Sequence, residues 1–213
     1  MKPLIVVNFK TYVQSTGSNG LHLAKVHDKA NGNIIICVQP TDIYKISKEV
    51  KIPVFSEHCD GHLTQGKNTG FVLPEAIKEA GAKGTLLNHA EHRMHIEDIE
   101  KSIQRCNALG LKVIVCTDNL KEVEDFKKLK PYAIAFEDPI LIGTGQSITK
   151  SKQDTVKKFA DLLKGTDILP LCGAGISTKE DIEEAVKLGT KGVLLASAIT
   201  TAEDPESVLK SLL

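Results

Sequence analysis

Three side chains of different chemistry stand where apolar runs of the sequence end. Lys10 follows the run PLIVV, His89 closes GTLLNH, and Glu137 closes YAIAFE. A carboxylate can take a proton from carbon, an imidazole can polarise a carbonyl, and an ammonium group can stabilise the negative charge that develops. If the fold brings them together, these three residue types predict a site for proton transfer next to a carbonyl.

The segment after Glu137 has the composition of a lid. It reads DPILIGTG, residues 138–145, with a proline near its start, aliphatic residues, and then Gly-Thr-Gly. We expect Asp138 and Pro139 to form the first hinge, residues 140–142 an apolar underside, and the glycines a flexible tip. Such a lid would exclude water, which strengthens electrostatic contacts in the site and protects a reactive intermediate.

Eight short β-rich runs alternate with amphipathic stretches along the chain. Most of these runs are almost continuously apolar, as strands buried on both faces must be. They are PLIVV, NIIICV, PVFSE, GTLLNH, KVIVCT, YAIAFE, ILPLCG and GVLLAS. No two neighbouring runs are joined directly by an Asn-Gly hairpin turn. The alternation predicts an α/β fold, a single-domain (β/α)8 TIM barrel over residues 1–213. A doubly wound open sheet is the alternative, although no GxGxxG motif follows the first run.

Three of the intervening stretches carry signals for helix ends. Ser151 and Asp154 have capping-box spacing at the start of SKQDTVKKFADLL. The stretch STKEDIEEAVKLG ends in Gly189, and DPESVLKSLL begins with Asp204 as cap and Pro205 at the first helical position. We expect a helix in each of these stretches.

The carboxyl ends of all strands in a parallel barrel open onto one face, so polar residues there would share a site. They are Asn8 with Lys10, Gln39, Glu57 with His58, Asn88 with His89, Thr117 with Asp118, Glu137, Cys172 with Gly173, and Ser197. This list combines a cation from the first unit, an imidazole from the fourth and a carboxylate from the sixth. The barrel reading therefore brings Lys10, His89 and Glu137 to one mouth.

At these residues the whole chain resembles the triosephosphate isomerase family. VNFK is similar to the family's Asn-aromatic-Lys motif, NHAEHR to its His-x-Glu motif after strand four, and AFEDPILIGTG to its catalytic glutamate and lid. The compact length, CGAGI and LLAS resemble the archaeal branch. The resemblance implies the family's known roles: Glu137 as base, neutral His89 as electrophile, and Lys10 as the cation that holds the anionic substrate and the enediolate charge.

The resemblance also implies supporting residues. Asn8 and Glu91 match positions that orient the oxyanion and the lysine. Backbone N–H groups are expected to bind the substrate phosphate, because small residues let the main chain approach an anion closely. The substrate-binding residues expected beside Asn8 and Lys10 are Ile142, Gly143, Gly175, Ala196 and Ser197.

The chain departs from the family pattern at a few positions. Ala196 and Ser197 stand where bacterial and eukaryotic members have Gly-Gly, and Ile140 stands where archaeal members usually have glutamate. Asp138 replaces the usual proline after the glutamate. The replacement is either neutral drift or, because Asp138 lacks proline's fixed φ, a change that leaves the first hinge freer in the open state. Since residues 137 and 138 alternate in direction, we expect Asp138 to face away from the substrate.

Composition favours a small-molecule partner. In 213 residues, lysine plus arginine and aspartate plus glutamate both number 27, so no net field attracts nucleic acid or an anionic membrane. The N-terminal apolar run is too short for a signal peptide or a membrane span, which favours a cytoplasmic protein. The odd number of cysteines, five, without a CxxC motif, predicts buried reduced thiols.

The histidines suggest a competing class, a metal-dependent hydrolase. All seven fall into three groups, His22 with His27, His58 with His62, and His89 with His92 and His95. Their spacing argues against zinc, since His92 and His95 run outward into the loop after the fourth strand instead of converging on it. We therefore expect neither a metal nor another cofactor.

The resemblance implies an isomerase acting on a small phosphorylated triose. The alternatives are another phosphosugar isomerase or epimerase, or a barrel that binds a phosphorylated metabolite without turnover. In the family the long loop here at residues 60–75 inserts into a neighbouring subunit, and Thr69 matches the tip residue that touches the partner's site. We expect a homo-oligomer, and favour a dimer over a tetramer because the helices are rich in charge.

Overall fold

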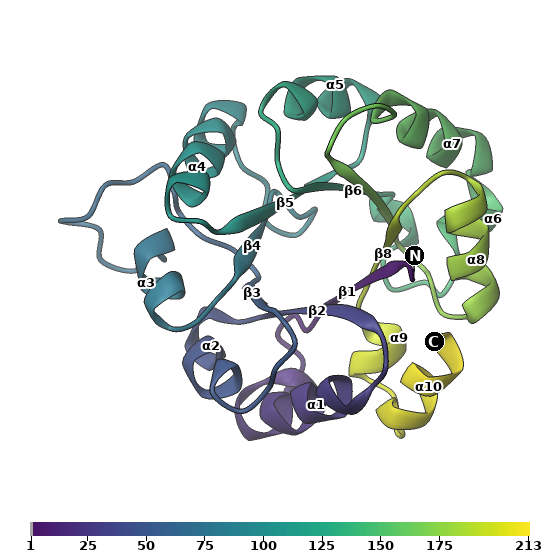
Figure 1. Cartoon of the computed structure of the whole chain (residues 1–213), viewed down its shortest axis with the longest axis horizontal. Helices are drawn as coiled ribbons and strands as arrows, with labels where there is room; N and C mark the ends of the chain where they lie inside the picture. Colours follow the sequence, from purple (N-terminus) through teal and green to yellow (C-terminus); the bar gives the residue numbers. More distant parts are fainter. Residues whose placement is uncertain (1) are drawn as a thin grey trace.

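Eight parallel strands close into one barrel in the computed structural model, which describes residues 2–213 (Figure 1). Each strand pairs with its neighbours in sequence, and β1 also pairs with β8, which closes the ring. The strands are β1 (Leu4–Asn8), β2 (Asn33–Val38), β3 (Val54–Ser56), β4 (Gly84–Leu87), β5 (Lys112–Thr117), β6 (Ala133–Glu137), β7 (Leu169–Gly173) and β8 (Gly192–Leu195). The predicted barrel is confirmed.

Helices surround the ring of strands (Figure 1). They are α1 (Gly17–Lys29), α2 (Pro40–Ser47), α3 (Pro74–Glu79), α4 (Ile96–Ala108), α5 (Leu120–Lys128), α6 (Ile148–Ser151), α7 (Gln153–Leu162), α8 (Lys179–Lys187), α9 (Ser197–Thr200) and α10 (Pro205–Leu212). Two short 3-10 turns, η1 (Val13–Ser15) and η2 (Pro139–Leu141), follow β1 and β6. Across residues 2–213, no helix has the length and apolar character needed to cross a membrane.

Two of the three predicted helix boundaries are confirmed. α8 begins with a capping box between Thr178 and Asp181, with Gly189 just beyond its end at φ 105°. At α10 the Asp204 side chain accepts a hydrogen bond from the Ser207 N–H. The predicted capping box at Ser151 is wrong, because this residue ends α6. Its hydroxyl donates to the Ser147 carbonyl four residues earlier and does not cap α7.

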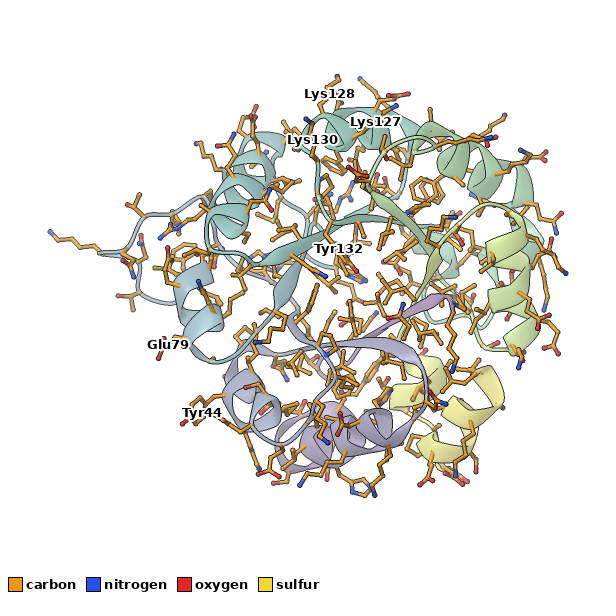
Figure 2. All side chains as sticks on the ribbon, in the orientation of Figure 1. Tyr44, Glu79, Lys127, Lys128, Lys130 and Tyr132 are labelled. Carbon is orange, nitrogen blue, oxygen red and sulfur yellow. The ribbon has the colours of Figure 1, made fainter. Side chains whose placement is uncertain are left out.

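The strands bury both faces. In β1, Leu4 and Val6 belong to a cluster inside the barrel, whereas Ile5 and Val7 pack in the larger cluster between the strands and the helices. Tyr132, just before β6, packs against the interior cluster (Figure 2). Successive strand residues point to opposite faces, so Asn8 continues the interior row of Leu4 and Val6 up to the barrel mouth.

The five cysteines are all buried free thiols, as predicted. Cys37, Cys116 and Cys172 lie in β2, β5 and β7, where burial raises the pKa of each thiol. Because a raised pKa keeps sulfur protonated, these residues act as small apolar core side chains and not as nucleophiles.

Candidate active site

Glu137 closes the interior row of β6. Ala133 and Ala135 face the barrel interior, and two residues further on the Glu137 side chain reaches the mouth while remaining only 6% exposed. Burial raises its pKa to about 7; the charge of Lys10 and a hydrogen bond with Cys116 oppose this shift. A carboxylate with a pKa near neutrality can both take up and return a proton at physiological pH.

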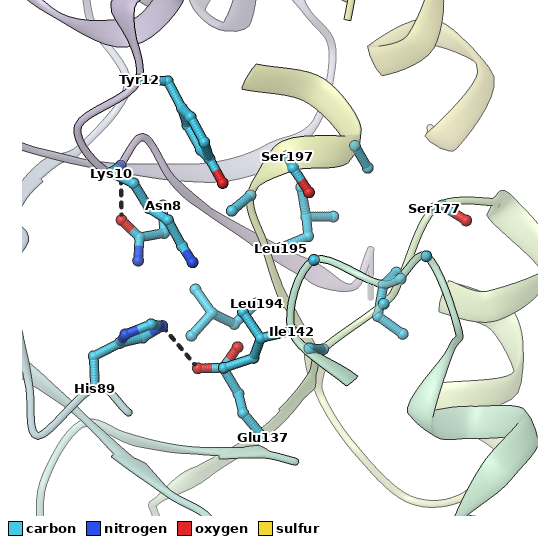
Figure 3. A pocket seen from close by; sticks show the side chains of 17 residues that line it. Asn8, Lys10, Tyr12, His89, Glu137, Ile142, Ser177, Leu194, Leu195 and Ser197 are labelled. Atoms are coloured by element: carbon cyan, nitrogen blue, oxygen red, sulfur yellow. Dashed lines mark hydrogen bonds and ion pairs between the residues drawn. The ribbon is translucent and has the colours of Figure 1, made fainter. Parts of the chain in front are cut away.

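His89 faces Glu137 across the mouth (Figure 3). The backbone N–H of Glu91 donates to His89 Nδ1 at 3.2 Å, so a neutral ring carries its proton on Nε2. His89 Nε2 lies 3.4 Å from Glu137 Oε2. Burial, and then the charge of Lys10, lower the pKa of His89 and favour the neutral ring. Its Nε2–H can therefore donate a hydrogen bond to a substrate oxygen held between the two side chains.

The backbone conformation of Lys10 sets the direction of its side chain. Its φ of 51° lies in the left-handed region, which non-glycine residues adopt at a cost, and the Asn8 side chain accepts the Lys10 N–H at 3.1 Å. The Lys10 ammonium group pairs with Glu91 Oε1 at 2.6 Å. Asn8 thus fixes the local turn, and Glu91 holds the free end of the lysine beside the cavity.

A second acid lies just after β3. Burial raises the pKa of Glu57 to about 8, although the nearby Lys10 N–H opposes this shift. Glu57 is therefore mostly protonated at pH 7 and adds little negative charge near Lys10 at that pH. Next to it, the rings of His58 and His92 stack with centroids 4.1 Å apart. Over residues 2–213, no cluster of three or more His, Cys, Asp or Glu side chains could hold a metal ion.

A cavity of about 130 Å³ opens between these side chains (Figure 3). Nine of the residues singled out from the sequence line it: Asn8, Lys10, His89, Glu137, Ile142, Gly143, Gly175, Ala196 and Ser197. Glu91 stands beside the cavity, where it contacts Lys10 and His89. Thr69 does not join them, since it is exposed on the loop between β3 and α3. Assignment of catalytic and binding roles to these residues remains a prediction.

Several lining residues escaped the sequence analysis. Tyr12, Ala174, Ser177 and Ala198 also line the cavity. In Figure 3 the Tyr12 ring extends toward Ser197. A signal existed for Tyr12, because it follows Asn8 and Lys10 at a spacing of two in NFKTY. The others adjoin residues already singled out, and only the path of the backbone decides which neighbours face the cavity.

The far end of the cavity is built from backbone. Gly175 has φ 76°, and a Cβ there would lie 1.8 Å from the Gln146 carbonyl oxygen, so a side chain cannot fit. Ala196 precedes α9 and Ser197 begins it. N–H groups in the first turn of a helix have no partner within the helix and can bind an anion. This end therefore suits a phosphate group.

The lid differs from the sequence prediction at two residues. Ile140 was expected on the apolar underside but is 80% exposed, whereas Leu141 is buried and Ile142 lines the cavity. The 3-10 turn η2 causes this, because it rotates successive side chains by about 120° instead of alternating them. At Asp138 the structure shows contacts that oppose a freer hinge: its side chain is buried and accepts the Ile140 N–H at 3.0 Å.

Comparison with known proteins decides the family. The sequence profile described as triosephosphate isomerase matches residues 3–212. The chain belongs to the triosephosphate isomerase family. Proteins named triosephosphate isomerase from Methanobacterium bryantii and Methanocaldococcus jannaschii are each 43% identical to it, over 99% of this chain and 95% and 98% of theirs. The protein of that name from Saccharolobus solfataricus is 41% identical, over 99% of this chain and 95% of its own.

The family match covers every segment that builds the cavity. It begins before β1 and extends to the last residue of α10, so all eight strand ends lie inside the matched region. The relatives' lengths are also nearly covered, which leaves little of their sequence without a counterpart here. The motifs VNFK, NHAEHR and AFEDPILIGTG therefore lie in a chain that matches triosephosphate isomerase from end to end.

Proposed function

We propose that this protein interconverts D-glyceraldehyde 3-phosphate and dihydroxyacetone phosphate through an enediolate, a step of glycolysis and gluconeogenesis. The observation that carries the proposal is the placement of the Glu137 carboxylate 3.4 Å from His89 Nε2, with Lys10 lining the same small cavity. The relatives bear the name of this activity. The reaction needs only these side chains, without a cofactor or metal.

In the proposed reaction the carbon acid loses and regains one proton. Glu137 takes a proton from the carbon next to the carbonyl, and the His89 Nε2–H donates to the carbonyl oxygen as it becomes negative. Lys10 and Asn8 stabilise the enediolate. His89 then relays a proton between the two oxygens, and Glu137 returns its proton to the other carbon. Backbone N–H groups at Gly143, Gly175 and Ser197 hold the phosphate throughout.

A coupled assay in both directions tests this proposal directly. Purified protein is given either triose phosphate, and phosphoglycolate is added as a competitive inhibitor that resembles the enediolate. The expected result is turnover of both trioses and inhibition by phosphoglycolate. Pentose and hexose phosphates are the control substrates, because a cavity of about 130 Å³ favours a triose. Turnover of a larger sugar phosphate instead would indicate a different isomerase or epimerase.

We expect kcat/KM to fall about tenfold per pH unit below pH 7 and to level off above it. Glu137 must be ionised to accept a proton, and burial raises its pKa to about 7, so acid removes the active form. The phosphate ester of the substrate ionises near pH 6, about one unit lower, so it does not account for a break at pH 7. Rates between pH 5.5 and 9 locate the break. Glu57→Gln is the control, because its pKa of about 8 should not set the acid limb. A break near pH 4.5 would remove Glu137 from this role.

We further propose a homodimer built around the loop of residues 60–75. Asp60 closes the base of this loop: its N–H donates to the Val72 carbonyl at 2.6 Å, and its carboxylate accepts the Val72 N–H at 2.7 Å. The loop projects from the barrel (Figure 1), and Phe71 near its end is 55% exposed. An ordered loop with an exposed aromatic side chain favours burial against a second subunit.

Shortening this loop should convert the dimer into a monomer. Because Asp60 and Val72 already meet, residues 62–71 can be replaced by two glycines without opening the barrel. Analytical ultracentrifugation should give twice the 23.1 kDa chain mass for the natural protein and the single mass for the shortened one. Lys67→Ala, a change on the same loop, is the control that should remain dimeric. A fully active natural monomer at micromolar concentration would overturn the assembly proposal.

Four further assignments complete the proposal. We place the protein in the cytoplasm, as suits an enzyme of central sugar metabolism, and assign it to the archaeal type because the most similar relatives reported above come from archaea. We also propose that residues 1–213 form one domain, since the helices and strands share a continuous core. The proposed partner is a small phosphorylated triose, with no nucleic acid or membrane involved.

A further inference from the structure

The first hinge of the lid is held by side-chain contacts. Asp138 follows Glu137 directly, has φ −85° and ψ 116°, and is buried. Its Oδ1 accepts the Ile140 N–H at 3.0 Å, which caps η2. Its Oδ2 forms an ion pair with the ammonium group of Lys152. Two groups thus fix the residue that connects Glu137 to the lid.

Lys152 belongs to the other end of the lid. It lies between α6 and α7, after the lid has returned to the barrel, so its ion pair with Asp138 joins the two ends. That returning end is itself anchored. The Ile148 N–H donates to the Ala174 carbonyl at 3.1 Å, and Lys150 pairs with the buried Asp181 at 2.9 Å.

The tip between these fixed ends is glycine-rich and surrounded by open space. Gly143 and Gly145 have φ values of 75° and 73°, and a Cβ on either would meet no atom of residues 2–213 within 4 Å apart from its immediate chain neighbours. Both glycines line the cavity. The lid therefore has open space around its glycines where it would meet a phosphate, and buried side-chain contacts where it joins Glu137.

We propose that Lys152 is a positioning residue for the isomerisation: through Asp138 it holds the backbone after Glu137, so that the lid tip can close without turning the Glu137 carboxylate out of the cavity. This inference rests on the proposed function. Displacement of a reacting group by about 1 Å can lower turnover about a hundredfold. A fixed hinge would prevent such a displacement of Glu137 when the neighbouring loop moves. Lys152 touches neither Glu137 nor the cavity, and acts only through its partner.

The charge state of the pair supports this role. Burial alone would raise the pKa of Asp138, but the hydrogen bonds from Lys152 and the Ile140 N–H, with the charge of Lys152, outweigh it and lower the pKa. Asp138 is therefore ionised throughout the working pH range. Removal of the Lys152 charge would leave a buried carboxylate held by one backbone N–H, a state that favours movement of the hinge toward water.

Lys152→Met removes the charge and keeps most of the side-chain length. We expect kcat to fall about five- to twentyfold while KM changes less than about twofold, since ground-state contacts to substrate are unchanged. Lys157→Met is the matched control: Lys157 pairs with Asp161 on α7 at 3.0 Å, and both side chains are exposed, so no kinetic change is expected. Calorimetric titration with phosphoglycolate measures the fraction of protein that binds this inhibitor. The kcat of each variant can then be expressed per folded active site.

Phosphate release gives a readout that a general loss of stability would not move. Elimination from the enediolate breaks the C–O bond, and the electron pair leaves with inorganic phosphate. The remaining enol tautomerises to a 2-oxoaldehyde, with no oxidant involved. A misplaced base returns the proton more slowly, so Lys152→Met should release at least about threefold more phosphate per isomerisation. Lys152→Arg keeps the ion pair and should restore most of kcat and the natural phosphate ratio.

The ion pair itself is tested by a double-mutant cycle. Asp138→Asn should reproduce the defect of Lys152→Met, and the double variant should be no worse than either single variant, because all three lack the same contact. Fully additive losses would overturn the inference. So would Lys152→Met with natural kcat and phosphate release, or with raised KM at unchanged kcat. Failure of the natural protein to interconvert the trioses would instead refute the proposed function.

Discussion

Glu137→Gln is expected to leave the barrel folded while lowering kcat by about three orders of magnitude or more. A positioned general base contributes about 10² to 10⁴ to rate, and an amide cannot accept a proton from carbon. The amide keeps the size of the side chain, so the cavity should still bind phosphoglycolate. Steady-state kinetics with either triose phosphate provides the measurement. Retention of more than about a tenth of natural kcat would show that another group removes the proton.

Glu137→Gln should raise the stability of the folded protein although it lowers activity. The folded-state pKa of Glu137 is raised from 4.5 to about 7, so its contribution to stability is complete below pH 4.5 and is lost as pH rises through 7. Glutamine does not titrate. Between pH 4.5 and 8 the variant should therefore gain up to about 3 kcal/mol of unfolding free energy relative to the natural protein. Denaturant titrations at these two pH values measure this, and an unchanged difference would contradict the buried-base assignment.

The barrel could be predicted because strand burial leaves a simple pattern. Parallel strands with the barrel interior on one face and helices on the other must be apolar on both, and β1, β2 and β5 each read as a nearly unbroken apolar run. The strand ends then place Asn8 and Glu137 at one mouth through simple alternation. Local signals also sufficed for α8 and α10. In each helix the capping side chain and the backbone N–H that it accepts lie three residues apart in the sequence.

Other features depend on contacts that no local pattern contains. The cap predicted at Ser151 failed because this residue is the last of α6, and its hydroxyl donates to the Ser147 carbonyl one turn earlier. Ile140 points outward because η2 replaces strand alternation with a tighter turn. The ion pair of Asp138 could not be predicted, since its partner Lys152 lies beyond the whole lid in sequence. Such side-chain pairs depend on where the lid returns to the barrel, which only the folded backbone determines.

Lys10→Met should have the second largest effect, a loss of about three orders of magnitude in kcat/KM. Among the described residues that line the cavity, Lys10 is the one permanent cation, facing a dianionic phosphate and a developing enediolate. Loss of a single preorganised donor costs about 10² to 10³ in enzymes that stabilise an oxyanion, and here ground-state binding of the phosphate is lost as well. Both kcat and KM should therefore worsen. Lys10→Arg keeps the charge and should recover part of the loss.

The pH profile of the same variant separates an electrostatic role from a structural one. The charge of Lys10 lowers the pKa of Glu137 and also lowers that of His89. Without it, both pKa values should rise, so the acid limb of the remaining activity should move above pH 7. Glu91→Gln is the opposite-sign comparison: it leaves the cation but removes a negative charge that raises the pKa of Glu137, so the acid limb should move below pH 7 while the activity loss stays below about tenfold. If Lys10→Met lowered the rate equally at every pH, the pKa values of Glu137 and His89 would not depend on the charge of Lys10. The role of the lysine would then be structural.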